Sequence, residues 1–286
     1  MGFFILNQTI FQKCIRIINY SFQYIGSLVN VENFISAYNF TYKNLDKDLI
    51  MFLKAATIAL IPALIIQGKN VKKNTPRLPE PEGLRDGTKG QGKKLSILIL
   101  GDSAAAGVGV EVQEDALLGG VLSELQNDYE ITWKLHAKSG DGTSQIIRAT
   151  EELPNQQYDI VLTSVGVNDV TKLMSADVWI KKQEKLYKLI QNKFQPSLII
   201  AAGVPPMNLF PALPNPLGWL FGQYSKKMNE ALSKFVEKTS NLEWIEYDIV
   251  KYQHLNLPMA YDGFHPSKEI YQIWAKEVAD KVRKSF

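Results

Sequence analysis

The carboxyl-terminal two thirds of the sequence alternate short apolar runs with longer amphipathic stretches, and this order restricts the fold more than any other feature. The apolar runs have the length and composition of buried strands. They are LSILILG from Leu95, ITWKLHA from Ile131, DIVLTSVG from Asp159, SLIIAAG from Ser197 and LEWIEYD from Leu242. Helical periodicity separates them over residues 115–126, 143–152, 177–194, 224–239 and 267–284. This alternation predicts a parallel five-stranded sheet with helices on both faces and a ligand site beyond the carboxyl ends of the strands.

Candidates for nucleophilic catalysis follow the first and the last of these predicted strands. Ser103 comes directly after the first strand, where a helix amino end would favour negative charge. Asp262 and His265 are three residues apart after the fifth strand, and Pro266 favours the start of a helix there. A serine hydrolase needs a hydroxyl, a base that removes its proton and an acid that orients the base. Ser103, His265 and Asp262 fit these three roles.

Hydrogen-bond donors for a developing oxyanion follow the same predicted strands. The backbone N–H groups of Ser103 and Gly140 and the side-chain amide of Asn168 are predicted to form an oxyanion hole. Gly142 is the alternative to Gly140. We prefer Gly140 because it follows Ser139 at the first turn beyond the second strand.

These segments together resemble the four sequence blocks of the SGNH (GDSL-type) hydrolases, in the same order. The matching blocks are Gly101-Asp102-Ser103, Gly140, Gly166-Val167-Asn168-Asp169 and Asp262-Gly263-Phe264-His265. Ala104 stands where that family usually has Leu. The resemblance covers residues 95–286 and implies a three-layer α/β/α flavodoxin-like sandwich, a serine nucleophile, glycine and asparagine oxyanion donors, and an Asp-x-x-His pair that completes a catalytic triad.

Other classes of protein fit the sequence less well. GDSAAAGVGV contains neither a P-loop nor a dinucleotide-binding glycine pattern, and Ala105 stands where an α/β-hydrolase elbow would have glycine. The three histidines form no metal-ligand pair, so we expect no metal and no cofactor. The formal charge of +3 is spread along the chain, which gives no indication of a nucleic-acid partner. The single cysteine, Cys14, excludes an internal disulfide.

The amino-terminal region has a different composition. We expect residues 1–74 to be a helical, membrane-associated region, with a candidate membrane helix at 49–66 whose only charged residue is Lys54. An interfacial helix and a buried amphipathic helix are the alternatives. Residues 75–94 are rich in proline, glycine and charge, which is typical of an exposed linker, and the catalytic domain would be 95–286. The basic residues after Ile66 favour a cytoplasmic location for that domain.

A long apolar loop, residues 201–222, follows the fourth predicted strand. Its place at the site edge suggests an acyl-binding wall or a lid that dips toward the membrane, with Met207, Phe210 and Leu213 as the candidate substrate contacts. Packing on the domain's own core is the plain alternative. With the amino-terminal region, this loop resembles a membrane-associated proteobacterial branch of the SGNH hydrolases. That resemblance implies association with a bacterial inner membrane.

The sequence therefore predicts a serine esterase that hydrolyses lipid-like or short acyl esters through an acyl-enzyme intermediate. An O-acyltransferase or a carbohydrate O-acetylesterase would use the same residues, and an inactive flavodoxin-like binding module is the remaining alternative. The expected partners are an ester substrate, which could be a lipid, and a membrane. The sequence does not predict the oligomeric state.

Overall fold

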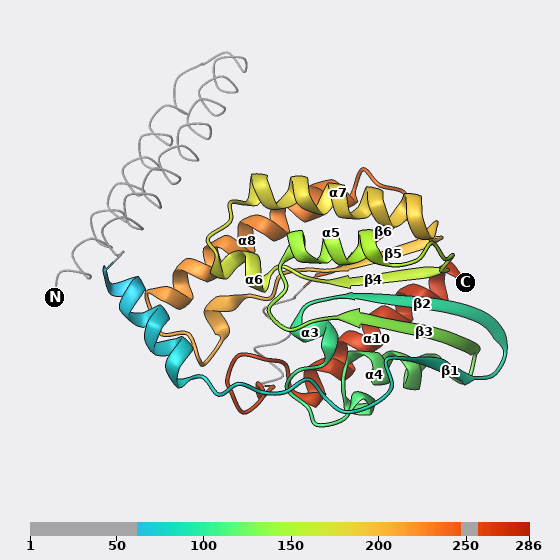
Figure 1. Ribbon diagram of the computed structural model, residues 1–286, viewed down its shortest axis with the longest axis horizontal. Coiled ribbons are helices and arrows are strands. Elements are labelled where there is room, and N and C mark those ends of the chain that lie inside the picture. The colour runs from blue at the N-terminus through green and yellow to red at the C-terminus, as the bar shows by residue number, and fades with distance from the viewer. Residues whose placement is uncertain (1–61, 247–256) are drawn as a thin grey trace, which may run out of the picture. The chain divides into compact units, whose positions relative to one another are not determined.

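Among the residues that the computed structural model describes, 62–246 and 257–286, six strands form one mixed sheet (Figure 1). Their order is β1-β3-β2-β4-β5-β6, with β1 antiparallel to β3 and the other pairs parallel. The strands are β1 (Asp86–Gly90), β2 (Lys93–Gly101), β3 (Tyr129–Ala137), β4 (Ile160–Ser164), β5 (Leu198–Ala202) and β6 (Leu242–Ile245). The predicted parallel pairing is confirmed, and the antiparallel edge strand β1 corrects the prediction of an all-parallel, five-stranded sheet.

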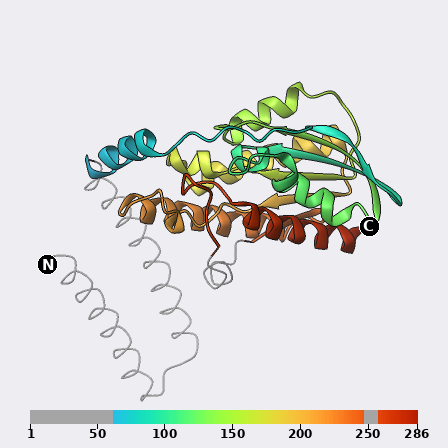
Figure 2. The ribbon, with the colours of Figure 1, turned by 90° about the horizontal axis from the view of Figure 1, so that it is seen from below.

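Helices cover both faces of the sheet, which confirms the predicted three layers (Figure 1; Figure 2 gives the view from below). One face carries α4 and α10, and the other carries α5, α7 and α8. The helices are α3 (Ser103–Ala106), α4 (Leu117–Leu125), α5 (Thr143–Glu152), α6 (Val167–Thr171), α7 (Ala176–Phe194), α8 (Leu217–Val236) and α10 (Lys268–Ser285), with the 3-10 turns η1 (Gln113–Asp115) and η2 (Met207–Leu209).

The apolar sequence of β2 suits its position at the centre of the sheet. Successive side chains of a strand point to opposite faces. Ile97 and Ile99 pack into the cluster under α4 and α10, whereas Leu98 and Leu100 pack into the cluster under α5, α7 and α8. All four are at most 1% exposed, and burial of each contributes about 1.5–3 kcal/mol. An uninterrupted apolar run therefore suits a strand that is covered on both faces.

The parallel strands have the order of flavodoxin-like sheets, and this order creates a crevice at one end of β2. The chain passes from β2 to β3 on one side and later crosses to β4 on the other side. The connections on the two sides of β2 diverge, which leaves space beyond its carboxyl end. Figure 1 shows α3 and α6 at this arrowhead end of the strands.

The segment expected to be an exposed linker, 75–94, is largely part of the folded domain. Asp86–Gly90 pairs in register with residues 130–134 of β3, and Pro81 is buried. Its glycine-rich, charged composition is that of a turn, but pairing with a neighbouring strand determines strand structure as much as local propensity does. Lys89 and the short length of β1 also suit an edge strand, where they discourage pairing with another chain.

A helix over residues 62–74 overlaps the end of the expected membrane segment. Leu64 and Val71 pack against the core cluster, and the Gln67 side chain donates to the Asn215 carbonyl (2.7 Å) and accepts from the Leu217 N–H (3.2 Å). The helix therefore continues beyond residue 66, the expected end of the candidate membrane segment. Within residues 62–246 and 257–286, no helix combines the length and hydrophobicity of a membrane span. Residues 1–61, which contain Cys14 and most of the candidate segment, lie outside the described residues.

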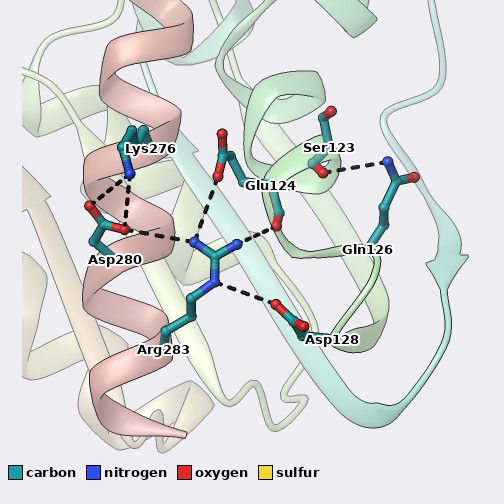
Figure 3. A network of polar contacts seen from close by, with 7 residues as sticks. All are labelled: Ser123, Glu124, Gln126, Asp128, Lys276, Asp280 and Arg283. Carbon is teal, nitrogen blue, oxygen red and sulfur yellow. Dashed lines mark hydrogen bonds and ion pairs between the residues drawn. The ribbon is translucent and has the colours of Figure 1, made fainter.

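The carboxyl end of α10 is tied to α4 through Arg283 (Figure 3). Its guanidinium donates to the Glu124 carbonyl (2.6 Å) and approaches the carboxylates of Asp128 (3.4 Å) and Asp280 (3.7 Å). Exposed ion pairs contribute little individually, but a planar guanidinium with several partners fixes relative orientation. This contact holds in place the helix that follows the His265 loop.

Candidate active site

Ser103 lies at the turn between β2 and α3, in the crevice beyond the end of β2. Asp102 precedes it and caps the helix, because its Oδ1 accepts the Ala104 N–H at 3.0 Å. The Asp102 N–H in turn donates to the Ser164 carbonyl (3.0 Å) on β4. Burial raises the pKa of Asp102 to about 7 despite the hydrogen bond from Ala104. The turn is thus fixed from both sides, with Ser103 at the first position of the helix.

The structure brings His265 and Asp262 to Ser103, although 162 residues separate Ser103 from His265 in the chain. The Ser103 Oγ lies 2.9 Å from His265 Nε2, and His265 Nδ1 lies 2.6 Å from Asp262 Oδ2. Asp262 Oδ1 accepts the backbone N–H groups of Phe264 and His265, each at 2.9 Å. The three predicted residues therefore form one hydrogen-bonded chain from carboxylate to hydroxyl.

The Asp262 carboxylate is held in its ionised form by its partners. Burial alone would raise the pKa of this carboxyl, but the hydrogen bonds from the His265 side chain, the His265 backbone and the Phe264 backbone outweigh it and lower the pKa. An ionised acceptor at Nδ1 keeps the proton on that nitrogen, which leaves Nε2 free to accept the Ser103 proton.

A close approach between two loops holds the His265 turn against the segment after α3. Gly109 has φ +116°, and a Cβ there would lie 2.2 Å from the Pro266 carbonyl oxygen. Ala260 N–H donates to the His265 carbonyl (2.9 Å), which closes the turn around Asp262. Only glycine allows this approach at position 109, because a side chain there would push the turn away from Ser103.

The loop after β3, residues 138–142, meets the start of α6 beside the crevice. Asn168 Nδ2 donates to the Asp141 carbonyl at 3.0 Å. Gly140 is exposed at the tip with φ +89°, and no described atom lies within 4 Å of the position that its Cβ would take. Gly142 is buried, and a Cβ there would lie 2.8 Å from Asp169 Oδ1. The two glycines named in the sequence therefore lie in different surroundings.

A buried polar cluster fixes the base of this loop. Asp169 Oδ2 accepts the Thr143 N–H (2.9 Å) and the Thr143 hydroxyl (2.6 Å), and the Gln183 amide donates to the same hydroxyl (2.9 Å). All three side chains belong to residues at most 1% exposed. In a site of low dielectric, such satisfied bonds are strong and specify one arrangement. Sequence reasoning missed Thr143 and Gln183, whose positions in the chain give no sign of a shared cluster.

An apolar cavity of about 540 Å³ opens next to Ser103 and His265. Its polar end contains Asp102, Ser103, Ser164 and His265. Hydrocarbon side chains and prolines line most of the remaining wall. These include Val204, Leu209, Phe210, Met259, Phe264 and Trp274. Such a volume is within the range of small-molecule binding sites.

Of the three predicted wall residues, only Phe210 lines this cavity. Met207 is 0% exposed and Leu213 is 7% exposed, and both are packed in the core cluster instead. The expected loop is shorter than predicted, because η2 turns Met207 inward and α8 begins at Leu217 rather than at Tyr224. The structure therefore places Met207 and Leu213 in the core and not in the cavity wall where the sequence suggested them.

Comparison with known proteins decides the family. The sequence profile of the GDSL-like Lipase/Acylhydrolase family matches residues 99–273, more than half of the chain. The chain belongs to this GDSL family. It is therefore an ester-hydrolysing enzyme. The comparison with curated proteins gives no match.

Solved structures show the same fold for this GDSL hydrolase. A lipolytic G-D-S-L family protein from Veillonella parvula is 15% identical, with a TM-score of 0.53 over 65% of this chain and 96% of the other. Axe2, an acetylxylan esterase from Geobacillus stearothermophilus, is 17% identical, with a TM-score of 0.50 over 67% of this chain and 95% of the other. At these identities the similarity shows the fold alone.

Two residues of the GDSL hydrolase that contact the end of β3 or the loop after it lie outside the family match. Glu80 and Arg85 precede residue 99, yet Glu80 accepts two hydrogen bonds from Ser139, next to Gly140. The linker-like composition of this segment gave no sign of such a contact. The predicted blocks themselves lie within residues 99–273, where the fold is that of the family.

Proposed function

We propose that this GDSL hydrolase is a serine esterase that cleaves carboxylic esters through an acyl-enzyme, with Ser103 as nucleophile. One observation carries the proposal: Ser103 Oγ, His265 and Asp262 are linked at 2.9 and 2.6 Å, with the imidazole between hydroxyl and carboxylate. This is the arrangement that makes a serine hydroxyl nucleophilic. His265 is the base and then the acid, and Asp262 orients its ring.

The first half of the reaction forms the acyl-enzyme. Ser103 Oγ attacks the ester carbonyl carbon while its proton passes to His265 Nε2, and the carbonyl oxygen becomes an oxyanion. When the tetrahedral intermediate collapses, the bond to the alcohol oxygen breaks and that oxygen takes the proton from Nε2. The alcohol leaves, and the acyl group stays on Ser103.

The second half repeats these steps with water. Nε2 removes a proton from a water molecule, whose oxygen attacks the acyl carbonyl, and the proton then returns to Ser103 Oγ as the carboxylic acid leaves. An alcohol in place of water would give transfer of the acyl group rather than hydrolysis.

Three donors are proposed for the oxyanion: the N–H groups of Ser103 and Gly140 and the Asn168 amide. The exposed position of Gly140 and the burial of Gly142 against Asp169 support the choice of Gly140. Asn168 Nδ2 carries two hydrogens, and the bond to the Asp141 carbonyl uses one of them. The other is available for a substrate oxygen.

The substrate is proposed to be an ester with a hydrocarbon acyl chain longer than acetyl. The cavity beside Ser103 is apolar apart from its end at the reacting groups, and its volume of about 540 Å³ far exceeds an acetyl group. Each methylene that is buried there contributes about 0.8 kcal/mol, or about fourfold in kcat/KM. Carbohydrate O-acetyl esters would leave most of this wall unused.

Acyl-chain profiling of the purified protein tests this proposal. We expect kcat/KM for p-nitrophenyl esters to rise from acetyl to octanoyl, and Ser103→Ala to lose at least about 1,000-fold in kcat. A fluorophosphonate should label Ser103, whereas Ser123→Ala, at an exposed serine on α4, should label and turn over like wild type. A Ser103→Ala rate within about tenfold of wild type would contradict the mechanism, and a maximum of kcat/KM at the acetyl ester would contradict the substrate class.

Faster product release with added alcohols would indicate an acyltransferase.

Membrane association is proposed for the full chain. The apolar composition of residues 49–66 supports it, as do the exposed side chains of Ile65 (52%) and Ile66 (60%) beside Lys69, Lys72 and Lys73. We expect the full chain to sediment with bacterial inner membranes and to resist a high-salt wash. Protease added to intact spheroplasts should leave the catalytic domain uncut, whereas its degradation would contradict the cytoplasmic location.

A further inference from the structure

Residues 80–85, here called the strap, cross from the loop after Ser103 to the loop after β3. The Glu82 N–H donates to the Glu111 carbonyl (2.9 Å), and the Gln113 N–H donates to the Glu82 carbonyl (2.8 Å). At the other end, the Leu135 N–H on β3 donates to the Arg85 carbonyl (2.6 Å). The strap is thus fixed at two points on the folded domain, one on the segment after α3 and one on β3.

Within the strap, the Glu80 carboxylate binds directly to the loop of residues 138–142. Its Oε1 accepts both the backbone N–H (2.8 Å) and the hydroxyl (2.9 Å) of Ser139. Its Oε2 accepts from Arg85 (2.6 Å), whose other terminal nitrogen donates to the Ala137 carbonyl (2.8 Å). Hydrogen bonds to an ionised acceptor are about twice as strong as neutral ones. One carboxylate therefore connects the end of β3 to the turn that precedes Gly140.

The position of Ser139 gives this contact a consequence for the site. The peptide that carries the Gly140 N–H joins Ser139 to Gly140, so its direction follows from the backbone conformation of Ser139. Glu80 holds Ser139 by its backbone and its side chain together, which restricts that conformation. Gly140 itself has no such restraint, because it is exposed and lacks a side chain.

We propose that Glu80 is a positioning residue for the oxyanion hole: through Ser139 it aims the Gly140 N–H at the developing oxyanion. The proposal rests on the proposed esterase function. Glu80 precedes the residues that match the family, 99–273, so the match itself does not include this contact. Glu80 also joins the loop of residues 138–142 to the segment that follows helix 62–74.

The ionisation state of Glu80 suits this role. Burial alone would raise the pKa of its carboxyl, but the hydrogen bonds from Ser139 and the charge of Arg85 lower the pKa below its usual value. The carboxylate therefore remains an acceptor for both Ser139 donors at the pH at which an imidazole base works.

A positioning role predicts a specific pattern in the kinetics. Removal of an entire oxyanion donor costs about 100- to 1,000-fold in kcat. Glu80→Ala leaves the Gly140 N–H in place but frees its direction, so we expect a smaller loss of about tenfold in kcat. KM should stay within about twofold, because the oxyanion exists only in the transition state. Glu80→Gln keeps a neutral acceptor for Ser139 and should recover part of the loss.

The experiment compares full-length variants with the octanoyl ester as substrate. Glu82→Gln is the matched control, since its exposed carboxylate lies two residues away and forms no hydrogen bond or ion pair within residues 62–246 and 257–286. Ser139→Ala and the double variant Glu80→Ala/Ser139→Ala complete a cycle, in which we expect less than additive losses. Hydrogen exchange at residues 138–142 should accelerate in Glu80→Ala but not in Glu82→Gln, with the melting temperature of both near that of wild type.

The outcomes separate this proposal from the esterase function. Wild type that hydrolyses no carboxylic ester would overturn the proposed function, and the role of Glu80 with it. If wild type and Glu82→Gln are active and Glu80→Ala keeps kcat within twofold, only the role of Glu80 is overturned. A raised KM with unchanged kcat, or additive losses in the cycle, would also contradict action through Ser139.

Discussion

The two sides of Ser103 are built in different ways. On the cavity side, apolar residues from the segments 203–211 and 257–259, together with Phe264, form a wall with few polar groups. On the loop side, residues 138–142 and Asn168 are fixed by directional hydrogen bonds, including that from Asn168 to Asp141 (3.0 Å). Ser103 thus faces an apolar wall on one side and hydrogen-bonding groups of fixed direction on the other.

This difference separates the selection of the acyl group from the rate of the reaction. Apolar contact is non-directional and grows with the area buried, so a wall can lose one side chain and still bind. An oxyanion donor acts only at a defined distance and angle, and small displacements reduce its effect steeply. Changes on the cavity side should therefore alter the dependence on chain length, and changes on the loop side should alter turnover for all esters alike.

Asn168→Ala is the change on the loop side with the largest expected effect. It removes the amide proposed to bind the oxyanion and the bond to the Asp141 carbonyl. We expect kcat to fall about 100- to 1,000-fold for acetyl and octanoyl esters alike, with KM nearly unchanged. Steady-state kinetics with both esters measure this. Lys172→Ala, at an exposed position just after α6, is the control and should behave as wild type. A loss of kcat confined to octanoyl esters would contradict the proposal that the loop side controls turnover and the cavity side controls chain-length selectivity.

Phe210→Ala is the corresponding change on the cavity side. Phe210 lines the cavity and packs edge-to-face on Phe264, with ring centroids 5.2 Å apart. We expect kcat/KM for the octanoyl ester to fall about tenfold, equivalent to lost contact with about two methylenes, while the acetyl ester changes less than twofold. A series of p-nitrophenyl esters from acetyl to decanoyl measures how steeply kcat/KM rises with acyl-chain length.

The control for Phe210 is another phenylalanine, Phe235, which packs against the same core cluster. Phe235 stacks on Tyr187 at 5.9 Å and does not line the cavity. Phe235→Ala should lower the unfolding free energy by a few kcal/mol and leave the slope with chain length unchanged. Equal changes of slope in both variants would show that general loosening, rather than the cavity wall, governs selectivity.

The sequence predicted the residues that lie next to a strand end and failed where side-chain direction depends on distant packing. Ser103 follows the first predicted strand, and Asp262 and His265 lie on the segment between the last strand and the last helix, so the parallel topology favours their meeting at one edge of the sheet. Whether Met207 points into the site or into the core depends on η2 and on where α8 begins, which a run of apolar residues does not specify.

Polar contacts between distant segments could not be predicted from the sequence either. Glu80 lies in a stretch with the composition of a linker, and its pairing with Ser139 follows from the docking of β1 on β3. Thr143 and Asp169 are 26 residues apart, and only the fold joins them. Propensity and motif describe neighbours in the chain, whereas these contacts depend on tertiary structure.

Asp102 lies at the border between the two sides and should have the smallest effect on turnover. Asn caps a helix as well as Asp does, so Asp102→Asn should keep kcat within about threefold at pH 8. Burial raises the pKa of the Asp102 carboxyl from 3.8 to about 7, so between these values the folded chain holds a proton that the unfolded chain releases. The free energy of unfolding of wild type should therefore fall relative to Asp102→Asn as the pH rises through this window, and stay level above it. Urea unfolding of both proteins from pH 4 to pH 8 measures the difference; a difference that grows in favour of wild type would mean that the ionised carboxylate is the stabilised form, and that the cavity border is more polar than its lining indicates.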